Sequence, residues 1–250
     1  MGEPRFADGA RADVGRAKES LRHEIWERLD AHHAVPASSA RDRVPTFVGA
    51  LEAADLLTTT DEWRRARSVL ANPDKAQLPV RAAALRAGKT VYLALPELDT
   101  EAPFHRLDPA ELTIPVEDAA SMRTATLFSP AVGLADLPVI DLVVCGSVAV
   151  NRAGARLGKG TGFADIELAL LADAGRISAE TTIATTVHPL QVVDGPLPET
   201  EHDVRVDLVV TPEEVVACHP PARTPRIFWD RLTPAMFASM PLLAARRPQP

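Results

Sequence analysis

The residues best suited to chemistry lie in one glycine-rich segment, 151–165, with the sequence NRAGARLGKGTGFAD. Its glycines at 158, 160 and 162 alternate with Lys159 and Thr161, and Arg156 precedes them. Glycine lacks a Cβ atom, so consecutive backbone N–H groups can turn towards one ligand, and a helix that begins after the loop adds the positive end of its dipole. This combination of amides and basic side chains favours an anion, in particular a phosphate group.

The spacing differs from the two best-known phosphate loops. Lys159 is followed by Gly160 rather than by Ser or Thr, so the segment is not a Walker loop, and it lacks the G-x-G-x-x-G pattern of dinucleotide-binding folds. Glycines at this spacing can also form only a tight turn between a strand and a helix. The sequence pattern by itself leaves both interpretations open.

Hydrophobic patterning predicts the elements that must position this loop. The β-branched run 138–150 before it predicts a buried strand, and 163–175 after it predicts a helix closed by Gly175. Helical spacing from 17 to before Pro36 predicts an amphipathic helix that carries Lys18 and Arg22 one turn apart. We further expect helices at 49–57, 61–72 and 80–89, strands within 90–96, 181–193 and 204–216, a possible helix start at 211–214, and short elements within 99–138.

Composition and charge limit the function classes. The 250 residues carry a net charge of −7, which disfavours nucleic-acid binding, and no apolar run is long enough to span a membrane. The two cysteines lie far apart, without a C-x-x-C pattern, so we expect a cytoplasmic protein without disulfides or structural zinc. We expect a flexible tail at 1–16 and one α/β domain over 17–250, with its Pro- and Arg-rich C-terminal segment docked on the body.

Three blocks of the sequence resemble one known family. RLGKGTGFAD at 156–165 is similar to the RLGxGxGYYD signature of 5-formyltetrahydrofolate cyclo-ligases, also called methenyltetrahydrofolate synthetases. AKESLR at 17–22 resembles the N-terminal Lys-x-x-Leu-Arg helix of that family, and 191–212 resembles its closing block. RDRVPTFVGALEAA, NPDKAQLPVR, DLVVCGSVAV and RIFWDRL have counterparts in the subgroup of methenyltetrahydrofolate synthetase domain-containing proteins.

The resemblance implies a fold and a reaction. The fold would be a Rossmann-like three-layer α/β sandwich with a mostly parallel central sheet, of the NagB/RpiA/CoA-transferase type. The reaction would use ATP and Mg²⁺: the formyl oxygen of 5-formyltetrahydrofolate attacks the γ-phosphate, and N10 then closes the ring to give 5,10-methenyltetrahydrofolate, ADP and phosphate. The expected partner is therefore a small molecule, a reduced folate or an analogue; the oligomeric state is not implied.

The resemblance also assigns residues to the site. The implied catalytic residues are Lys18, Arg156 and Lys159; the nucleotide-binding residues are Lys18, Arg22, Arg156, Gly158, Lys159, Gly160, Thr161 and Gly162; the substrate-binding residues are Asp74, Gln77 and Phe163; the metal ligand is Asp165. Without the resemblance, Lys18 and Arg22 would fit an exposed helix face, Asp165 a helix cap and Asp74 a turn.

Two departures from the family pattern concern the substrate side. The Tyr-Tyr pair of the family is Phe163-Ala164 here, and its E-x-x-T stretch falls on Asp74 and Gln77. These departures leave open two alternatives: the same ATP-dependent chemistry on a non-folate amide or carboxylate, or a non-catalytic descendant that binds a ligand or partner.

Overall fold

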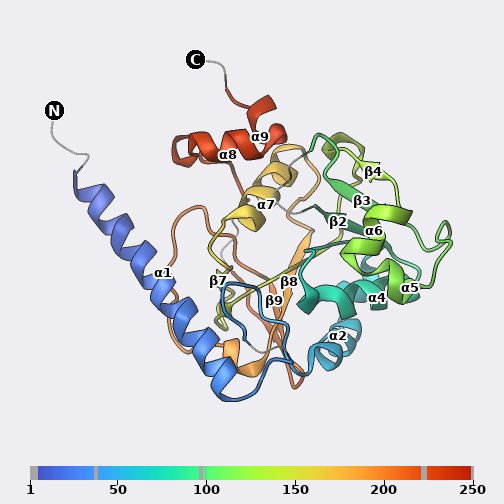
Figure 1. The fold of residues 1–250 in the computed structure, drawn as a ribbon, viewed down its shortest axis with the longest axis horizontal. Helices are drawn as coiled ribbons and strands as arrows, with labels where there is room; N and C mark the ends of the chain where they lie inside the picture. The colour runs from blue at the N-terminus through green and yellow to red at the C-terminus, as the bar shows by residue number, and fades with distance from the viewer. Residues whose placement is uncertain (1–4, 37–38, 96–97, 99, 221–223, 249–250) are drawn as a thin grey trace.

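The computed structural model describes residues 5–36, 39–95, 98, 100–220 and 224–248, and its core is an eight-stranded sheet (Figure 1). The strands lie in the order β10-β9-β8-β5-β1-β2-β3-β4. Neighbours from β9 to β2 are parallel, and the outer strands β10, β3 and β4 are antiparallel. Their bounds are β1 Ser68–Ala71, β2 Thr90–Ala94, β3 Phe104–Leu107, β4 Ala131–Val132, β5 Leu142–Cys145, β8 Thr182–Thr186, β9 Leu208–Val210 and β10 Val215–Ala217. The expected mostly parallel sheet is confirmed.

Helices cover both faces of this sheet, which gives the predicted three layers. Successive residues of a strand point to opposite faces, so Val69 packs with α2 (Ala50–Thr58) and α4 (Leu78–Arg86), whereas Leu70 lies in the core that contains α7 (Phe163–Asp173). The other helices on the body are α3 Asp61–Arg65, α5 Val116–Ala119, α6 Met122–Phe128, α8 Pro234–Ser239 and α9 Pro241–Ala245, with short 3-10 turns at η1 Lys75–Gln77, η3 Leu134–Asp136, η4 Pro189–Gln191 and η5 Trp229–Arg231.

The long N-terminal helix α1 (Arg5–Ala31) packs on a separate hairpin rather than on the main sheet. This hairpin pairs β6 (Ala149–Val150) with β7 (Arg156–Leu157), and Ile25 and Leu29 of α1 are buried against it. The other end of α1 extends along the side of the molecule (Figure 1). The expected flexible tail at 1–16 is therefore wrong for residues 5–16, which continue the helix; residues 1–4 lie outside the described part. Adding residues to an existing helix costs far less than nucleating a new one.

Two other segments differ from the sequence-based expectation. The predicted helix at 61–72 ends at Arg65, and its second half is strand β1, all four residues of which are buried. Burial between two helical layers outweighs local helical preference here. The possible helix start at 211–214 is a tight turn instead, closed by the Thr211 N–H donating to Glu214 O at 2.9 Å, and it leads into the antiparallel strand β10.

The C-terminal segment lies on the body, as expected. Met240, Leu242 and Leu243 are buried in the core that contains Leu168 and Leu171 of α7. Because these contacts are apolar and enclosed, the segment is part of the domain rather than a loose end. Within the described residues, no helix has the length and hydropathy needed to cross a membrane.

Candidate functional site

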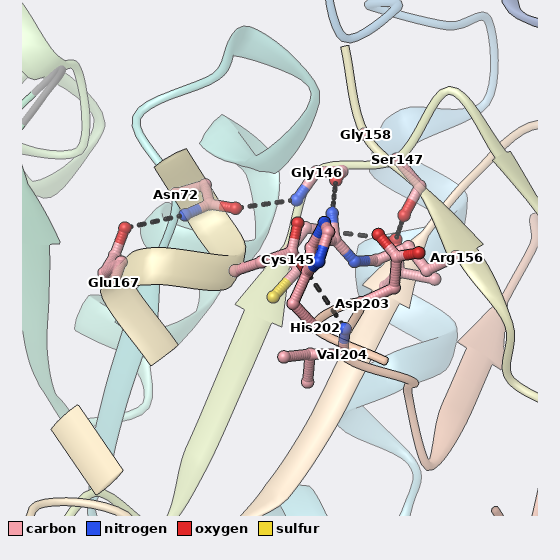
Figure 2. Close-up of polar contacts among 12 residues, drawn as sticks. Asn72, Cys145, Gly146, Ser147, Arg156, Gly158, Glu167, His202, Asp203 and Val204 are labelled. Atoms are coloured by element: carbon pink, nitrogen blue, oxygen red, sulfur yellow. Dashed lines mark hydrogen bonds and ion pairs between the residues drawn. The ribbon is translucent and has the colours of Figure 1, made fainter. Parts of the chain in front are cut away.

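The site lies where the direction of strand connection reverses. The chain leaves β1 towards β2 on one side and leaves the neighbouring strand β5 towards β8 on the other, and open α/β sheets bind ligands at the carboxyl ends of such a strand pair. Asn72 follows β1 and Gly146 follows β5. The Gly146 N–H donates to Asn72 Oδ1 at 2.9 Å and joins the two strand ends (Figure 2).

A cavity of about 250 Å³, here named the switch-point cavity, opens at these strand ends. Apolar side chains form much of its wall, and three residues with carboxyl groups, Asp74, Asp165 and Glu167, line it. Its lining residues are Val44, Asn72, Pro73, Asp74, Leu95, Leu98, Met122, Gly146, Arg156, Gly158, Lys159, Thr161, Gly162, Phe163, Ala164, Asp165 and Glu167. The structure thus places Phe163, Asp74 and Lys159 around one space.

The glycine loop, residues 158–162, forms one wall of this cavity and leads directly into α7. Gly160 and Gly162 have φ angles of 109° and 72°, which favour glycine. Among the described residues, no hydrogen bond uses the backbone N–H groups of 159–162, and no side chain caps the start of α7. Lys159 is exposed and has no hydrogen bond or ion pair with any described residue. Unengaged amides, a helix N-terminus and a free ammonium group together suit an anion.

A second cavity, of about 760 Å³ and here named the α1 cavity, lies on the other side of the glycine loop. Lys18 and Arg22 of α1 face it, and Gly158, Gly162 and Asp165 line both cavities. Arg22 Nε donates to Gly158 O at 2.9 Å. A Cβ atom on Gly160 would lie 3.2 Å from Arg22 Cζ, so the absence of a side chain allows this close approach. The predicted nucleotide-binding residues from α1 and from the loop are therefore together.

Lys18 has a carboxylate partner that the sequence analysis did not assign to the site. Its Nζ lies 2.5 Å from Asp203 Oδ2, and both side chains are nearly buried. Burial raises the pKa of Asp203, but the hydrogen bonds from Lys18 and from the Thr200 N–H outweigh it, and the pKa is lowered overall. Asp203 therefore fixes the position of the Lys18 side chain at the wall of the α1 cavity.

Arg156 is buried behind the glycine loop and is not exposed on the loop surface. Its side chain is 1% exposed; Nη1 donates to Gly146 O at 2.9 Å and Nη2 to Asp165 Oδ1 at 2.7 Å. Burial lowers the pKa of Arg156, but the neighbouring Asp165 carboxylate raises it more, so the pKa lies above its usual value. Asp165 Oδ1 also accepts from the Val204 N–H at 3.0 Å. Arg156 thus fixes the loop to β5 and supplies charge from below.

The predicted metal ligand Asp165 is therefore already engaged through one oxygen. Among the described residues, no three His, Cys, Asp or Glu side chains are grouped so that they could hold a metal ion. Mg²⁺ usually retains several waters and binds through one or two carboxylates plus substrate phosphates. The carboxylates of Asp165, Glu199, Glu201 and Asp203 line the α1 cavity. Asp165 and Asp203 fit that mode, and the described residues form no all-protein cage there.

The two substrate-side predictions from the E-x-x-T stretch have different outcomes. Asp74 lines the switch-point cavity, where burial raises its pKa and the nearby Lys159 ammonium partly offsets this. The assignment of Gln77 to the substrate site is wrong. Gln77 is fully buried, its Nε2 lies 3.4 Å from Thr186 Oγ1, and it lines neither cavity. The 3-10 turn η1 places Gln77 on the inner side of the chain, away from the ligand space.

Glu167 is the functional candidate that the sequence analysis missed. Burial, with the Asp74 carboxylate nearby, raises its pKa to about 8. Its Oε2 lies 3.5 Å from Asn72 Nδ2 (Figure 2). A signal existed in FADIELALL: Glu167 is one helical turn after Phe163 and lies inside an otherwise apolar run, and an acidic residue in such a position is unusual.

Comparisons with known proteins agree with this geometry. The model of the 5-formyltetrahydrofolate cyclo-ligase family matches residues 14–212. Methenyltetrahydrofolate synthase domain-containing proteins of Bos taurus and Homo sapiens are each 34% identical, over 245 and 243 residues; each comparison covers 94% of this chain, and 63% and 62% of the relatives. The chain thus spans less than two thirds of the length of these relatives.

A solved structure supports the fold independently. The NMR structure of Aquifex aeolicus 5,10-methenyltetrahydrofolate synthetase superposes with a TM-score of 0.52 at 17% identity, and covers 84% of this chain and 95% of that one. At this identity the likeness concerns the fold alone. The family match includes α1 from residue 14 onward, both strand ends and the glycine loop, and on this basis the chain belongs to the 5-formyltetrahydrofolate cyclo-ligase family.

Proposed function

We propose that the protein is an ATP-dependent cyclo-ligase that converts 5-formyltetrahydrofolate and ATP into 5,10-methenyltetrahydrofolate, ADP and phosphate. The observation that carries this proposal is the position of the glycine loop between two cavities. Lys18 and Arg22 line one cavity together with the carboxylates of Asp165, Glu199, Glu201 and Asp203, whereas much of the wall of the other cavity is apolar. A phosphoryl group held at the loop can be reached from both sides.

The α1 cavity fits the triphosphate of ATP. The backbone N–H groups of 159–162 have no hydrogen-bond partner among the described residues, α7 begins directly after them, and Lys18 and Arg22 add positive charge from α1. Its volume of about 760 Å³ lies within the range of small-molecule sites. Mg²⁺ would enter with the phosphates, next to Asp165 or Asp203, and would neutralise charge that develops there.

The switch-point cavity fits the second substrate. Phe163, Leu98 and Met122 provide apolar wall for a ring, and Lys159 reaches the same space from the loop. Lys159 therefore lies where negative charge would develop between the two substrates, and a positive group preorganised at that point stabilises phosphoryl transfer. Arg156 and Asp165 hold the loop that carries it.

The alternatives depend on the substrate-side departures. The Phe163-Ala164 pair lacks the two hydroxyl groups of the family pattern, and a related reaction on a non-folate amide or carboxylate is the alternative that this difference raises. A binding module without activity would keep the fold and lose the reaction. We further infer a cytoplasmic location, since the two cysteines are buried and unpaired.

The test is to incubate the purified protein with 5-formyltetrahydrofolate, ATP and Mg²⁺ and to follow the methenyl product by absorbance, with ATP binding measured by calorimetry. We expect product formation that stops when the metal is chelated. ATP binding without product would contradict the folate reaction and favour the non-folate substrate. Absence of both would contradict either enzyme function and leave the binding module.

A further inference from the structure

Glu167 is buried without a full set of hydrogen-bond partners. It is 5% exposed, and its Oε1 has no partner among the described residues. Its Oε2 lies 3.5 Å from Asn72 Nδ2, which is a weak contact. A buried polar atom that is left unpaired destabilises the folded state, and native proteins rarely keep one without a reason.

The orientation of this carboxyl group is set by its neighbours. Asn72 Oδ1 accepts from the Gly146 N–H at 2.9 Å, so the Asn72 side chain must present its nitrogen to Glu167 (Figure 2). Oε2 is therefore the oxygen that faces Asn72, which leaves Oε1 for another donor. Because Glu167 lines the switch-point cavity, a ligand in that cavity can supply the donor.

The cavity around Glu167 indicates the chemistry of that ligand. Its wall is largely apolar, with Leu95, Leu98, Met122 and Phe163, which suits the faces of a planar ring. A second carboxyl group, that of Asp74, lies against the same strand end, since a Cβ atom on Gly146 would be 2.7 Å from its Oδ2. Acceptor oxygens at one end of an apolar slot select a ring whose edge donates N–H groups.

We propose that Glu167 determines substrate specificity by accepting, at Oε1, a hydrogen bond from an amino or ring N–H at the edge of a planar nitrogen heterocycle. This inference rests on the proposed function and narrows it. The aminopyrimidine edge of a reduced folate has such donors, and an open-chain amide or carboxylate does not. Gln77, which the family resemblance assigned to the substrate side, does not reach the cavity.

The most informative variant is Glu167→Gln, because Asn72 determines which way the new amide group points. The Asn72 nitrogen requires an acceptor, so the glutamine must turn its oxygen towards Asn72 and its NH₂ group towards the cavity. A donor then replaces the acceptor without a change of shape. The matched control is Asp173→Asn, the same change on the same helix at an exposed carboxylate.

The experiment measures Kd by calorimetry for 5-formyltetrahydrofolate and for its 2-deamino analogue, with both variants and the wild type. We expect Glu167→Gln to weaken binding of 5-formyltetrahydrofolate about 10- to 100-fold, with KM raised and ATP affinity unchanged. The deamino analogue should bind the wild type with the same weakened affinity that 5-formyltetrahydrofolate has for Glu167→Gln. The affinity of the analogue should be the same for the wild type and for Glu167→Gln. The comparison of ligands on the wild type holds even if the variant folds poorly.

The outcomes separate this inference from the proposed function. If 5-formyltetrahydrofolate is converted, but its affinity changes neither with Glu167→Gln nor with removal of the 2-amino group, the specificity role is overturned and the reaction stands. If binding depends on both but no methenyl product forms, the reaction is overturned and the specificity role stands. If 5-formyltetrahydrofolate does not bind the wild type, both are overturned.

Discussion

At the scale of single residues, the basic groups of the site differ in whether they already form hydrogen bonds or ion pairs within the protein. Lys18 is paired with Asp203, and Arg156 is enclosed by Gly146 and Asp165. Lys159, by contrast, is exposed and has no partner among the described residues. Its positive charge is therefore the one that a ligand can engage without breaking an internal contact.

Replacing Lys159 by alanine should weaken ATP binding without loss of stability. Removal of one charge-assisted hydrogen bond costs about 1.5 to 3 kcal/mol in affinity, and no internal contact of the folded state is lost. Calorimetry gives the affinity and thermal unfolding gives the stability. Lys75→Ala, at an exposed lysine outside both cavities, is the control and should bind ATP as the wild type does. Equal affinities for the two variants would remove Lys159 from the site.

Glu167 should make the stability of the protein depend on pH. In the ligand-free protein its pKa is about 8 in the folded state against an ordinary value of 4.5, so between these pH values the ligand-free folded state retains a proton that the unfolded state has lost. Stability is therefore greatest below pH 4.5 as far as this group is concerned, and its contribution is lost as pH rises towards 8.

Glu167→Gln should remove that dependence. Urea unfolding at several pH values between 5 and 9 should show a free energy of unfolding that falls with pH in the wild type and falls less in the variant. Glu27→Gln, at an exposed carboxylate of α1, should follow the wild type. Parallel curves for all three proteins would mean that Glu167 is ionised in the folded state.

At the scale of elements, the glycine loop works because α1 can approach it closely. Gly160 adopts a φ of 109°, and its Cα lies against the guanidinium of Arg22. Gly160→Ala would introduce backbone strain of roughly 1 to 2 kcal/mol. It would also push Arg22 from Gly158 O, since the new Cβ atom would be 3.2 Å from Cζ.

We therefore expect Gly160→Ala to lower ATP affinity about tenfold or more, a cost of roughly 1.4 kcal/mol. Gly175→Ala provides the matched control. Gly175 also has a positive φ, 66°, but a Cβ atom there would meet nothing within 4 Å, and it lines neither cavity. It should lower the melting temperature and leave ATP affinity unchanged. The same loss of affinity in both variants would assign the effect to general destabilisation.

At the scale of the whole molecule, the C-terminal segment packs into the hydrophobic core that contains α7. Leu243 is fully buried there with Leu168 and Leu171. Leu243→Ala should lower the free energy of unfolding by about 2 to 5 kcal/mol through lost burial and the cavity it leaves. ATP affinity, measured below the transition, should not change.

Leu127→Ala is the control for this change, because Leu127 is 73% exposed on α6. A substitution at such a position is expected to alter stability by less than about 0.5 kcal/mol. If Leu243→Ala were equally mild, the C-terminal segment would not be part of the cooperative core.

The sequence by itself determined the α/β class, the glycine loop and the pairing of Lys18 with Arg22 on one helix face. Each of these depends on local rules: glycine at positive φ, the helical period, and continuous apolar runs for buried strands. It also identified the family through motifs that lie within short blocks. These features are encoded within a few neighbouring residues, so a single chain is enough to show them.

Only the tertiary structure decided which polar groups face the ligand. Gln77 and Glu167 are both polar residues in apolar surroundings, yet one is enclosed and the other lines a cavity. The difference arises from contacts such as Asn72 with Glu167, which are 95 positions apart. The same holds for β1, where burial between two layers outweighed a helical pattern. Burial is a property of how distant segments pack, and local sequence does not contain it.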